Sequence, residues 1–165
     1  MSGLDPEQCT ILEIATLVTD AELNIVAEGP ELVIHHEDAV LDAMDEWCTK
    51  HHGQSGLTAQ VKASTISLEQ AESLTLDFIA AHCAARTAPL CGNTIWQDRR
   101  FLGRYMPKLD AHLHYRLVDV STIKELARRW YPKLEAPAKS DSHRAMDDIR
   151  ESIAELRFYR ANLFR

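Results

Sequence analysis

The sequence predicts an α/β protein in which a sheet lies between layers of helices. Two apolar, β-branched segments open the chain at residues 9–19 and 25–34. Further along, short apolar segments at 88–92 and 116–120 are each followed by a segment with helical periodicity. Strands first, and then strand–helix alternation, are typical of a sheet covered by helices. With 165 residues, 45% of them hydrophobic, the chain suits a single domain over 1–165.

The first half of the chain gives two strands and three helices. Residues 9–19 predict an inner strand, and 25–34 a second strand that Gly29 and Pro30 interrupt, which favours a bulge or an edge position. Apolar spacing predicts helices over 37–47 and 57–63, with a loop over 51–56. A long helix over 67–86 begins at a capping box.

The second half alternates strands and helices. Residues 88–92 predict a short strand, followed by a helix from about residue 97. Residues 116–120 predict another strand, and Thr122 with Glu125 forms a capping box for the helix after it. A loop at 131–140 leads to a last helix over 143–164, which Asp141 or Ser142 can cap.

Charge and composition exclude several classes of protein. The formal net charge of −7 argues against a protein that coats long nucleic acid, because such affinity comes mainly from basic contacts to phosphates. A very short nucleic acid, with one or two phosphates, remains compatible. No apolar run approaches a membrane span and no signal peptide opens the chain, so we expect a cytoplasmic protein. Four cysteines without a CxxC pair indicate free thiols.

The last predicted helix carries two adjacent carboxylates. At about 100° per residue, Asp148 falls at the margin of the apolar side of this helix, and Asp147 falls nearly opposite, towards water. We therefore expect Asp148 to be partly buried, and a partly buried carboxylate needs a cation beside it. Either a metal ion or an arginine such as Arg99 or Arg100 could supply that charge.

A second carboxylate, Asp98, lies in the first turn of a helix that follows a strand. The carboxyl end of a strand is a favoured place for sites in α/β sheets, although an acidic residue there also compensates the helix dipole. Together with Asp148 and His143, it would make a carboxylate pair and a base. That set is the minimum for metal-assisted hydrolysis of a phosphodiester.

Five segments then resemble one family. They are GLDPE at 3–7, EIATLVTD at 13–20, CGNTIWQDRRFL at 91–102, HYRLVDVSTIKELARRW at 114–130 and HRAMDDIRES at 143–152. They are similar to the oligoribonucleases among the DEDDh 3′→5′ exonucleases, along essentially the whole chain. The resemblance implies a ribonuclease-H-like mixed sheet flanked by helices. It also implies hydrolysis of very short RNA to nucleoside 5′-monophosphates with two divalent ions, Mg²⁺ or Mn²⁺.

The resemblance also assigns roles to individual residues. The family's third carboxylate corresponds to Asp98, its histidine to His143 and its fourth carboxylate to Asp148. Tyr115 matches a tyrosine that reaches into the partner's active site in the family's homodimer. The implied substrate-binding residues are Leu4 against the bases, Trp47 and His52 near the 3′ end, and Thr94, Arg116, Ser121 and Thr122 around the 5′-phosphate.

One departure from the family concerns its first two carboxylates. They form an Asp-x-Glu on a central strand just before the turn with which this sequence begins. We expect that the sequence starts at an internal methionine and that this strand lies upstream. Two rival functions stay open: a related exonuclease acting on longer DNA or RNA, and a non-catalytic dimer that binds short RNA. Net charge and the Tyr115 motif count against the first, and the absent Asp-x-Glu favours the second.

Overall fold

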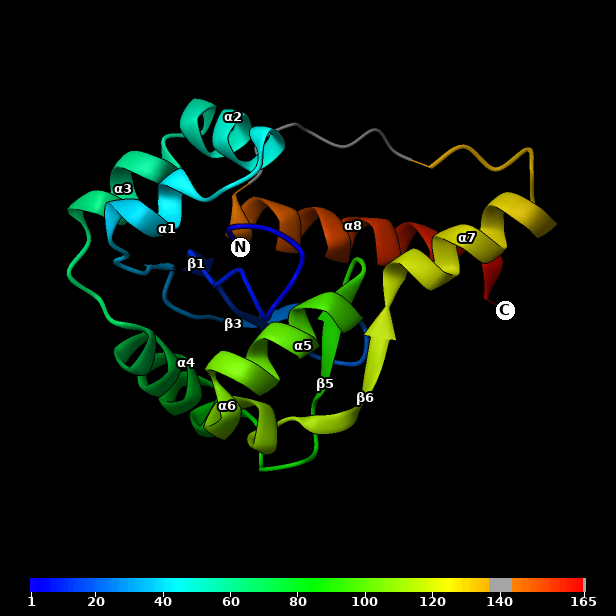
Figure 1. The fold of residues 1–165 in the computed structure, drawn as a ribbon. Helices are drawn as coiled ribbons and strands as arrows, with labels where there is room; N and C mark the ends of the chain where they lie inside the picture. Colours follow the sequence, from blue (N-terminus) through cyan, green and yellow to red (C-terminus); the bar gives the residue numbers. More distant parts are fainter. Residues whose placement is uncertain (137–143, 165) are drawn as a thin grey trace.

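The computed structural model describes residues 1–136 and 144–164, and it confirms a mixed α/β fold (Figure 1). Its strands are β1 (Glu13–Ile14), β2 (Leu17–Thr19), β3 (Ile25–Glu28), β4 (Leu32–Val33), β5 (Pro89–Gly92) and β6 (His114–Asp119). Within the described ranges they form three two-stranded sheets: β1–β4 and β2–β3 are antiparallel, and β5–β6 is parallel.

The two strands predicted over 9–19 and 25–34 are each divided in two. Gly29 and Pro30 separate β3 from β4, where the sequence predicted an interruption. The Gly29 N–H donates to the Thr16 carbonyl at 2.9 Å, and a Cβ on Gly29 would meet the Phe78 ring at 2.7 Å. Helix α4 (Leu68–His82), which carries Phe78, therefore packs too closely against this point for a larger residue.

The helices cover these sheets. They are α1 (Asp38–Asp42), α2 (Glu46–Gln54), α3 (Leu57–Ala63), α4 (Leu68–His82), α5 (Ile95–Tyr105), α6 (Pro107–His112), α7 (Val120–Trp130) and α8 (Ala145–Leu163). Figure 1 shows α1–α3 gathered at one end, α4–α6 together on one side, and α8 running along the top of the β5–β6 pair towards α7. The fold thus brings residues near the carboxyl end of β5 close to α8.

Several helix boundaries differ from the predictions. The helix expected over 37–47 is broken, because the Asp45 side chain accepts from the Cys48 N–H at 2.7 Å and starts α2. The loop predicted over 51–56 is wrong for 51–54, which complete α2. The capping box of Ser67 and Gln70 is confirmed, but α4 ends at His82 rather than 86, since Cys83 is already extended. Helix α6 was not predicted.

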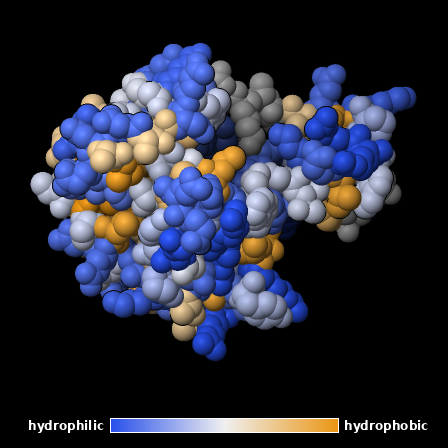
Figure 2. Space-filling view, viewed as in Figure 1, coloured by the Kyte–Doolittle hydropathy of each residue, from blue (hydrophilic) through white to orange (hydrophobic). Residues whose placement is uncertain are grey.

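The core consists of separate apolar clusters rather than one. The largest joins the first strands to α4, α5 and α6, with Phe101, Ile34 and Met106 fully buried. A smaller cluster of Val120, Ala127 and Tyr159 packs α7 against α8. Figure 2 shows that the visible surface is mostly hydrophilic, with apolar colour in small separate areas. None of the described helices has the length and apolarity needed to cross a membrane.

Candidate active site

The junction between β5 and α5 forms the floor of the site. Strand β5 ends at Gly92, and Thr94 precedes α5 with a left-handed backbone at φ 51°. The Thr94 N–H donates to the Asp119 Oδ1 at 3.0 Å and to the Ser121 Oγ at 2.9 Å. Because β5 and β6 are parallel, their carboxyl ends meet here, and the two predicted phosphate-binding residues Thr94 and Ser121 are in direct contact.

Asp98 lies in the first turn of α5, as predicted, and is half-buried. Burial raises the pKa of this carboxyl to about 6, and the negative charges of Asp119 and Asp148 act in the same direction. Asp98 and Asp148, far apart in sequence, are therefore close enough in space to influence each other's ionisation.

The start of α7 differs from the prediction. The helix begins at Val120, and its N-cap is Asp119, whose Oδ1 accepts from the Ser121 N–H at 2.9 Å. The predicted capping box of Thr122 and Glu125 is therefore wrong. The Ser121 N–H, which an uncapped helix start would offer to an anion, is occupied by the Asp119 carboxylate.

Asp148 is exposed, so the prediction of partial burial is wrong, and Asp147 is exposed as well. The buried side of α8 is centred on Ser152 and Glu155, not on the apolar residues alone. Asp148 lies on that same side one turn earlier, where its carbonyl accepts from the Ser152 Oγ at 2.7 Å. The predicted side of the helix was right, but Asp148 lies in the first turn of α8, whereas on this side the buried residues Ser152, Glu155 and Tyr159 come later in the helix.

Arg99 and Arg100, the alternative partners for Asp148, make their contacts elsewhere. Arg99 pairs with Asp110 at 2.5 Å and donates to the His114 carbonyl at 2.9 Å. Arg100 donates to the Gln97 side chain at 3.0 Å. The Arg99 contacts hold α5 to α6 and β6, whereas the Arg100 contact stays within α5. His143, the predicted base, lies outside the described residues, as do the predicted capping residues Asp141 and Ser142.

The residues predicted to contact the bases (Leu4) and the 3′ end of the substrate (Trp47 and His52) lie within the first 52 residues. Leu4 is 76% exposed, and its carbonyl accepts from the side chain of Gln97, the neighbour of Asp98. Trp47 is also exposed and stacks on His51, with ring centroids 4.0 Å apart. His52 is buried, and its Nε2 lies 2.9 Å from the Met1 carbonyl. Burial lowers the pKa of His52, so the ring is neutral at physiological pH.

Tyr115 and Arg116 lie on β6, apart from these residues. Tyr115 is 74% exposed, its ring is tilted against His114 at 4.5 Å, and the Arg116 guanidinium lies 5.4 Å from its centre. An aromatic ring this exposed, in contact with two neighbouring side chains, is available to contact another molecule.

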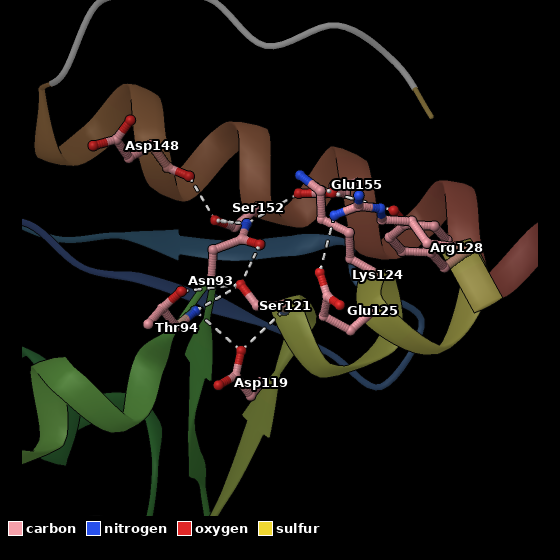
Figure 3. A network of polar contacts seen from close by, with 11 residues as sticks. Asn93, Thr94, Asp119, Ser121, Lys124, Glu125, Arg128, Asp148, Ser152 and Glu155 are labelled. Carbon is pink, nitrogen blue, oxygen red and sulfur yellow. Dashed lines mark hydrogen bonds and ion pairs between the residues drawn. The ribbon is translucent and has the colours of Figure 1, made fainter. Parts of the chain in front are cut away.

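A polar network behind the site was missed by sequence reasoning (Figure 3). Its central residue is Asn93, whose Nδ2 donates to Ser152 Oγ at 2.9 Å and to Glu155 Oε2 at 3.1 Å. The Asn93 Oδ1 accepts from Ser121 Oγ at 3.1 Å. A polar residue directly after a strand, as Asn93 is after β5, was the available signal.

The chemistry of these donors suits a hard divalent cation. Carboxylate oxygens are the preferred ligands of Mg²⁺ and Mn²⁺, and Asp98 and Asp148 supply such oxygens near enough for the charge of Asp148 to raise the pKa of Asp98. No group of three or more metal-ligating side chains occurs within residues 1–136 and 144–164. The described residues therefore fit such an ion in kind and provide part of its ligands.

The chain is similar to known proteins over nearly its whole length. A family model described as Exonuclease matches residues 1–156. The chain is 60% identical to an oligoribonuclease of Marinobacter nauticus over 100% of this chain and 92% of that protein. It is also 60% identical to an oligoribonuclease of Alcanivorax borkumensis, over 97% and 89%. With the mitochondrial oligoribonuclease of Homo sapiens it shares 54% identity, over 100% of this chain and 70% of the human one.

Proposed function

The chain belongs to the Exonuclease family, and from this premise we propose that it is a 3′→5′ exoribonuclease that hydrolyses very short RNA to nucleoside 5′-monophosphates. The identity of 54–60% to proteins named oligoribonuclease, over most of their length, carries this proposal. The formal net charge of −7 supports a short substrate, which needs few phosphate contacts. In this proposal, residues 1–165 form one exonuclease domain, and the enzyme acts in the cytoplasm.

The family implies dependence on divalent metal, and we place two Mg²⁺ or Mn²⁺ ions at Asp98 and Asp148. When bound, such ions polarise the attacking water and stabilise charge on the leaving oxygen. Support for this placement is the closeness of two carboxylates and the raised pKa of Asp98, since a bound cation would offset both burial and repulsion. His143 takes the proton of the attacking water, because an imidazole titrates near neutral pH. The P–O3′ bond of the last phosphodiester breaks, and the 3′-oxygen leaves with a proton.

The remaining predicted residues hold the two ends of the substrate. Leu4 packs against the bases, and exposed Trp47 offers a ring near the 3′ end, where buried His52 supports the segment beneath it. We assign the 5′-phosphate to the contact of Thr94 and Ser121, with Arg116 and Thr122 as the other predicted phosphate-binding residues. The direct contact between Thr94, which precedes α5, and Ser121, in the first turn of α7, supports the assignment of these two residues to one site.

Tyr115 acts in the partner subunit's site of a homodimer. Its exposure of 74% on β6, with an arginine over the ring, supports an intermolecular role. Mixing Tyr115→Ala and His143→Ala chains should restore part of the activity that each homodimer lacks, because one site of each heterodimer keeps both residues. If exchanged heterodimers stay as inactive as the parents, Tyr115 does not act across the interface.

The direct test is cleavage of a labelled RNA dinucleotide compared with a long single-stranded DNA. We expect fast release of nucleoside 5′-monophosphate from the dinucleotide and slow cleavage of the DNA. His143→Ala should lower turnover of the dinucleotide roughly 100-fold or more, as loss of a general base does, while Asp77→Asn on the exposed side of α4 leaves turnover unchanged. Faster cleavage of the long DNA, or tight binding of the dinucleotide without cleavage, would contradict the proposed function.

A further inference from the structure

The first turn of α8, which carries Asp148, is capped by a residue of a distant strand. Its N-cap residue is Arg144, whose own side chain makes no capping hydrogen bond within the part of the chain that the structure describes. The first N–H groups of a helix find no acceptor inside the helix, and a negative charge beside them complements the helix dipole. Glu13 of β1 meets both needs, because its Oε2 accepts from the Ala145 N–H at 3.0 Å. The start of α8 is thereby held against β1 (Figure 1).

Glu13 also binds the side chain of the N-cap residue. The Glu13 side chain is only 5% exposed, and a buried carboxylate requires a cation beside it. Arg144 is that cation: its Nε and Nη2 donate to Glu13 Oε1 at 3.0 Å and 2.6 Å. The same Nη2 donates to the Gln60 side chain of α3 at 2.8 Å. Both oxygens of Glu13 therefore bind the start of α8, one through the backbone and one through a side chain.

The backbone of Arg144 in turn holds Asp148. The Arg144 carbonyl accepts from the Asp148 N–H at 3.0 Å, which is the first hydrogen bond that an N-cap residue makes with its helix. The residue whose side chain is held by β1 and α3 thus also fixes the backbone of the proposed ion ligand. If the start of α8 frayed, this bond would open and the Asp148 side chain would lose its fixed direction.

We propose that Glu13 is a positioning residue for Asp148 as an ion ligand and acts through Arg144 and Ala145. This inference rests on the proposed function, since it takes Asp148 as a ligand of the divalent ion. It assigns no chemical step to Glu13. Its role is to order the first turn of α8 before an ion binds, so that less ordering has to accompany binding.

The test removes one acceptor from this anchor while keeping its size. Glu13→Gln leaves a single accepting oxygen, whereas Arg144 and Ala145 offer donors to two, so one link between β1 and α8 is lost. We expect the Kd for Mn²⁺ to rise roughly 10-fold, as it does when a residue behind a metal ligand is changed. In EDTA, hydrogen exchange of the Asp148 amide should be roughly 10-fold faster, because its bond to Arg144 opens more often.

A matched control lies on the same helix. Glu28→Gln makes the same chemical change in a glutamate of β3 that pairs with Arg150 of α8 at 2.6 Å. The two side chains of this pair are 48% and 44% exposed, and their hydrogen bond involves no backbone group of the first turn. Glu28→Gln should therefore keep the wild-type Kd for Mn²⁺ and the wild-type exchange rate of the Asp148 amide.

A second variant separates position from charge. Arg144→Met removes the ion pair with Glu13 and leaves the Ala145 bond in place. Loss of a positive charge would by itself tighten the binding of a cation, whereas loss of the anchor weakens it. We expect a higher Kd for Mn²⁺ than in the wild type. If Glu13→Gln does not fold, this variant decides.

The outcomes distinguish this inference from the proposed function. If the wild type binds Mn²⁺ but does not cleave a dinucleotide, the proposed function fails, and the Kd values still test the positioning role. If it cleaves, but both Glu13→Gln and Arg144→Met keep the wild-type Kd, the positioning role is overturned and the function stands. The role is also overturned if Glu28→Gln is as defective as Glu13→Gln, or if Asp148→Asn binds Mn²⁺ as tightly as the wild type.

Discussion

Two carboxylates on α8, those of Asp148 and Glu155, lie in opposite environments. Asp148, in the first turn, is exposed, and its charge helps to raise the pKa of Asp98 across the site. Glu155, about two helical turns further along the same side, is buried and held by Lys124 and Asn93. One carboxylate adds to a concentration of negative charge, and the other is compensated within the fold.

The difference distinguishes a structural carboxylate from a functional one. Around Glu155 the protein has supplied a cation and hydrogen-bond donors, as a buried charge requires. Around Asp98 the neighbouring charges of Asp119 and Asp148 oppose its ionisation. Perturbation of this kind, on a residue at the carboxyl end of a strand, is why we propose Asp98 as a cation ligand.

The largest expected effect is at Asp148. Asp148→Asn should lower dinucleotide turnover roughly 100-fold and weaken Mn²⁺ binding, because it removes an ion ligand. Asp147→Asn, the same change on the next exposed residue, should alter turnover less than about twofold, since surface changes away from a site have small effects. Parallel kinetics and metal titrations measure both variants. Equal losses in the two would remove the distinction between these neighbours.

A smaller effect is expected at Glu155, whose charge is compensated by Lys124. Lys124→Met removes a cation from the buried Glu155 and should lower the free energy of unfolding by about 1–3 kcal/mol, less than for a fully buried pair because the Lys124 side chain is 39% exposed. Adding Glu155→Gln should recover most of the loss. Arg129→Met, which breaks the exposed pair with Glu125, should cost about 0.5 kcal/mol. Urea unfolding measures each, and no recovery in the double variant would indicate lost packing instead.

The smallest effect concerns Asp98 and pH, in EDTA. Its pKa of about 6 lies above the ordinary 3.8, so ionised Asp98 destabilises the fold. In the wild type, the free energy of unfolding should fall as pH rises from about 4 to 6, because Asp98 ionises over this range. Asp98→Asn has no such charge and should be more stable than the wild type by about 1–2 kcal/mol above pH 6. The two proteins should converge below about pH 4. Thermal unfolding across pH measures the gap, and a gap that widens towards acid would contradict the assigned pKa.

Local sequence signals predicted much of the fold. The capping box at Ser67, the helix at 57–63 and the strand at 88–92 depend on residues within one or two turns of each other, and all three are confirmed. Helix α6 was missed because its first N–H groups are bonded by Glu72 of α4, a partner distant in sequence. Spacing alone cannot indicate such a contact.

The sequence by itself determined the mixed α/β class, the place of Asp98 after a strand and the family resemblance of the whole chain. Only the tertiary structure decided which acidic residues are buried. Apolar periodicity put Asp148 at a buried margin and gave no role to Glu155, whereas packing against α7 and the β5–α5 junction reversed the two. The physical reason is that a charge can be buried wherever distant elements bring a cation and donors to it, and Lys124 and Asn93 are brought there by the fold.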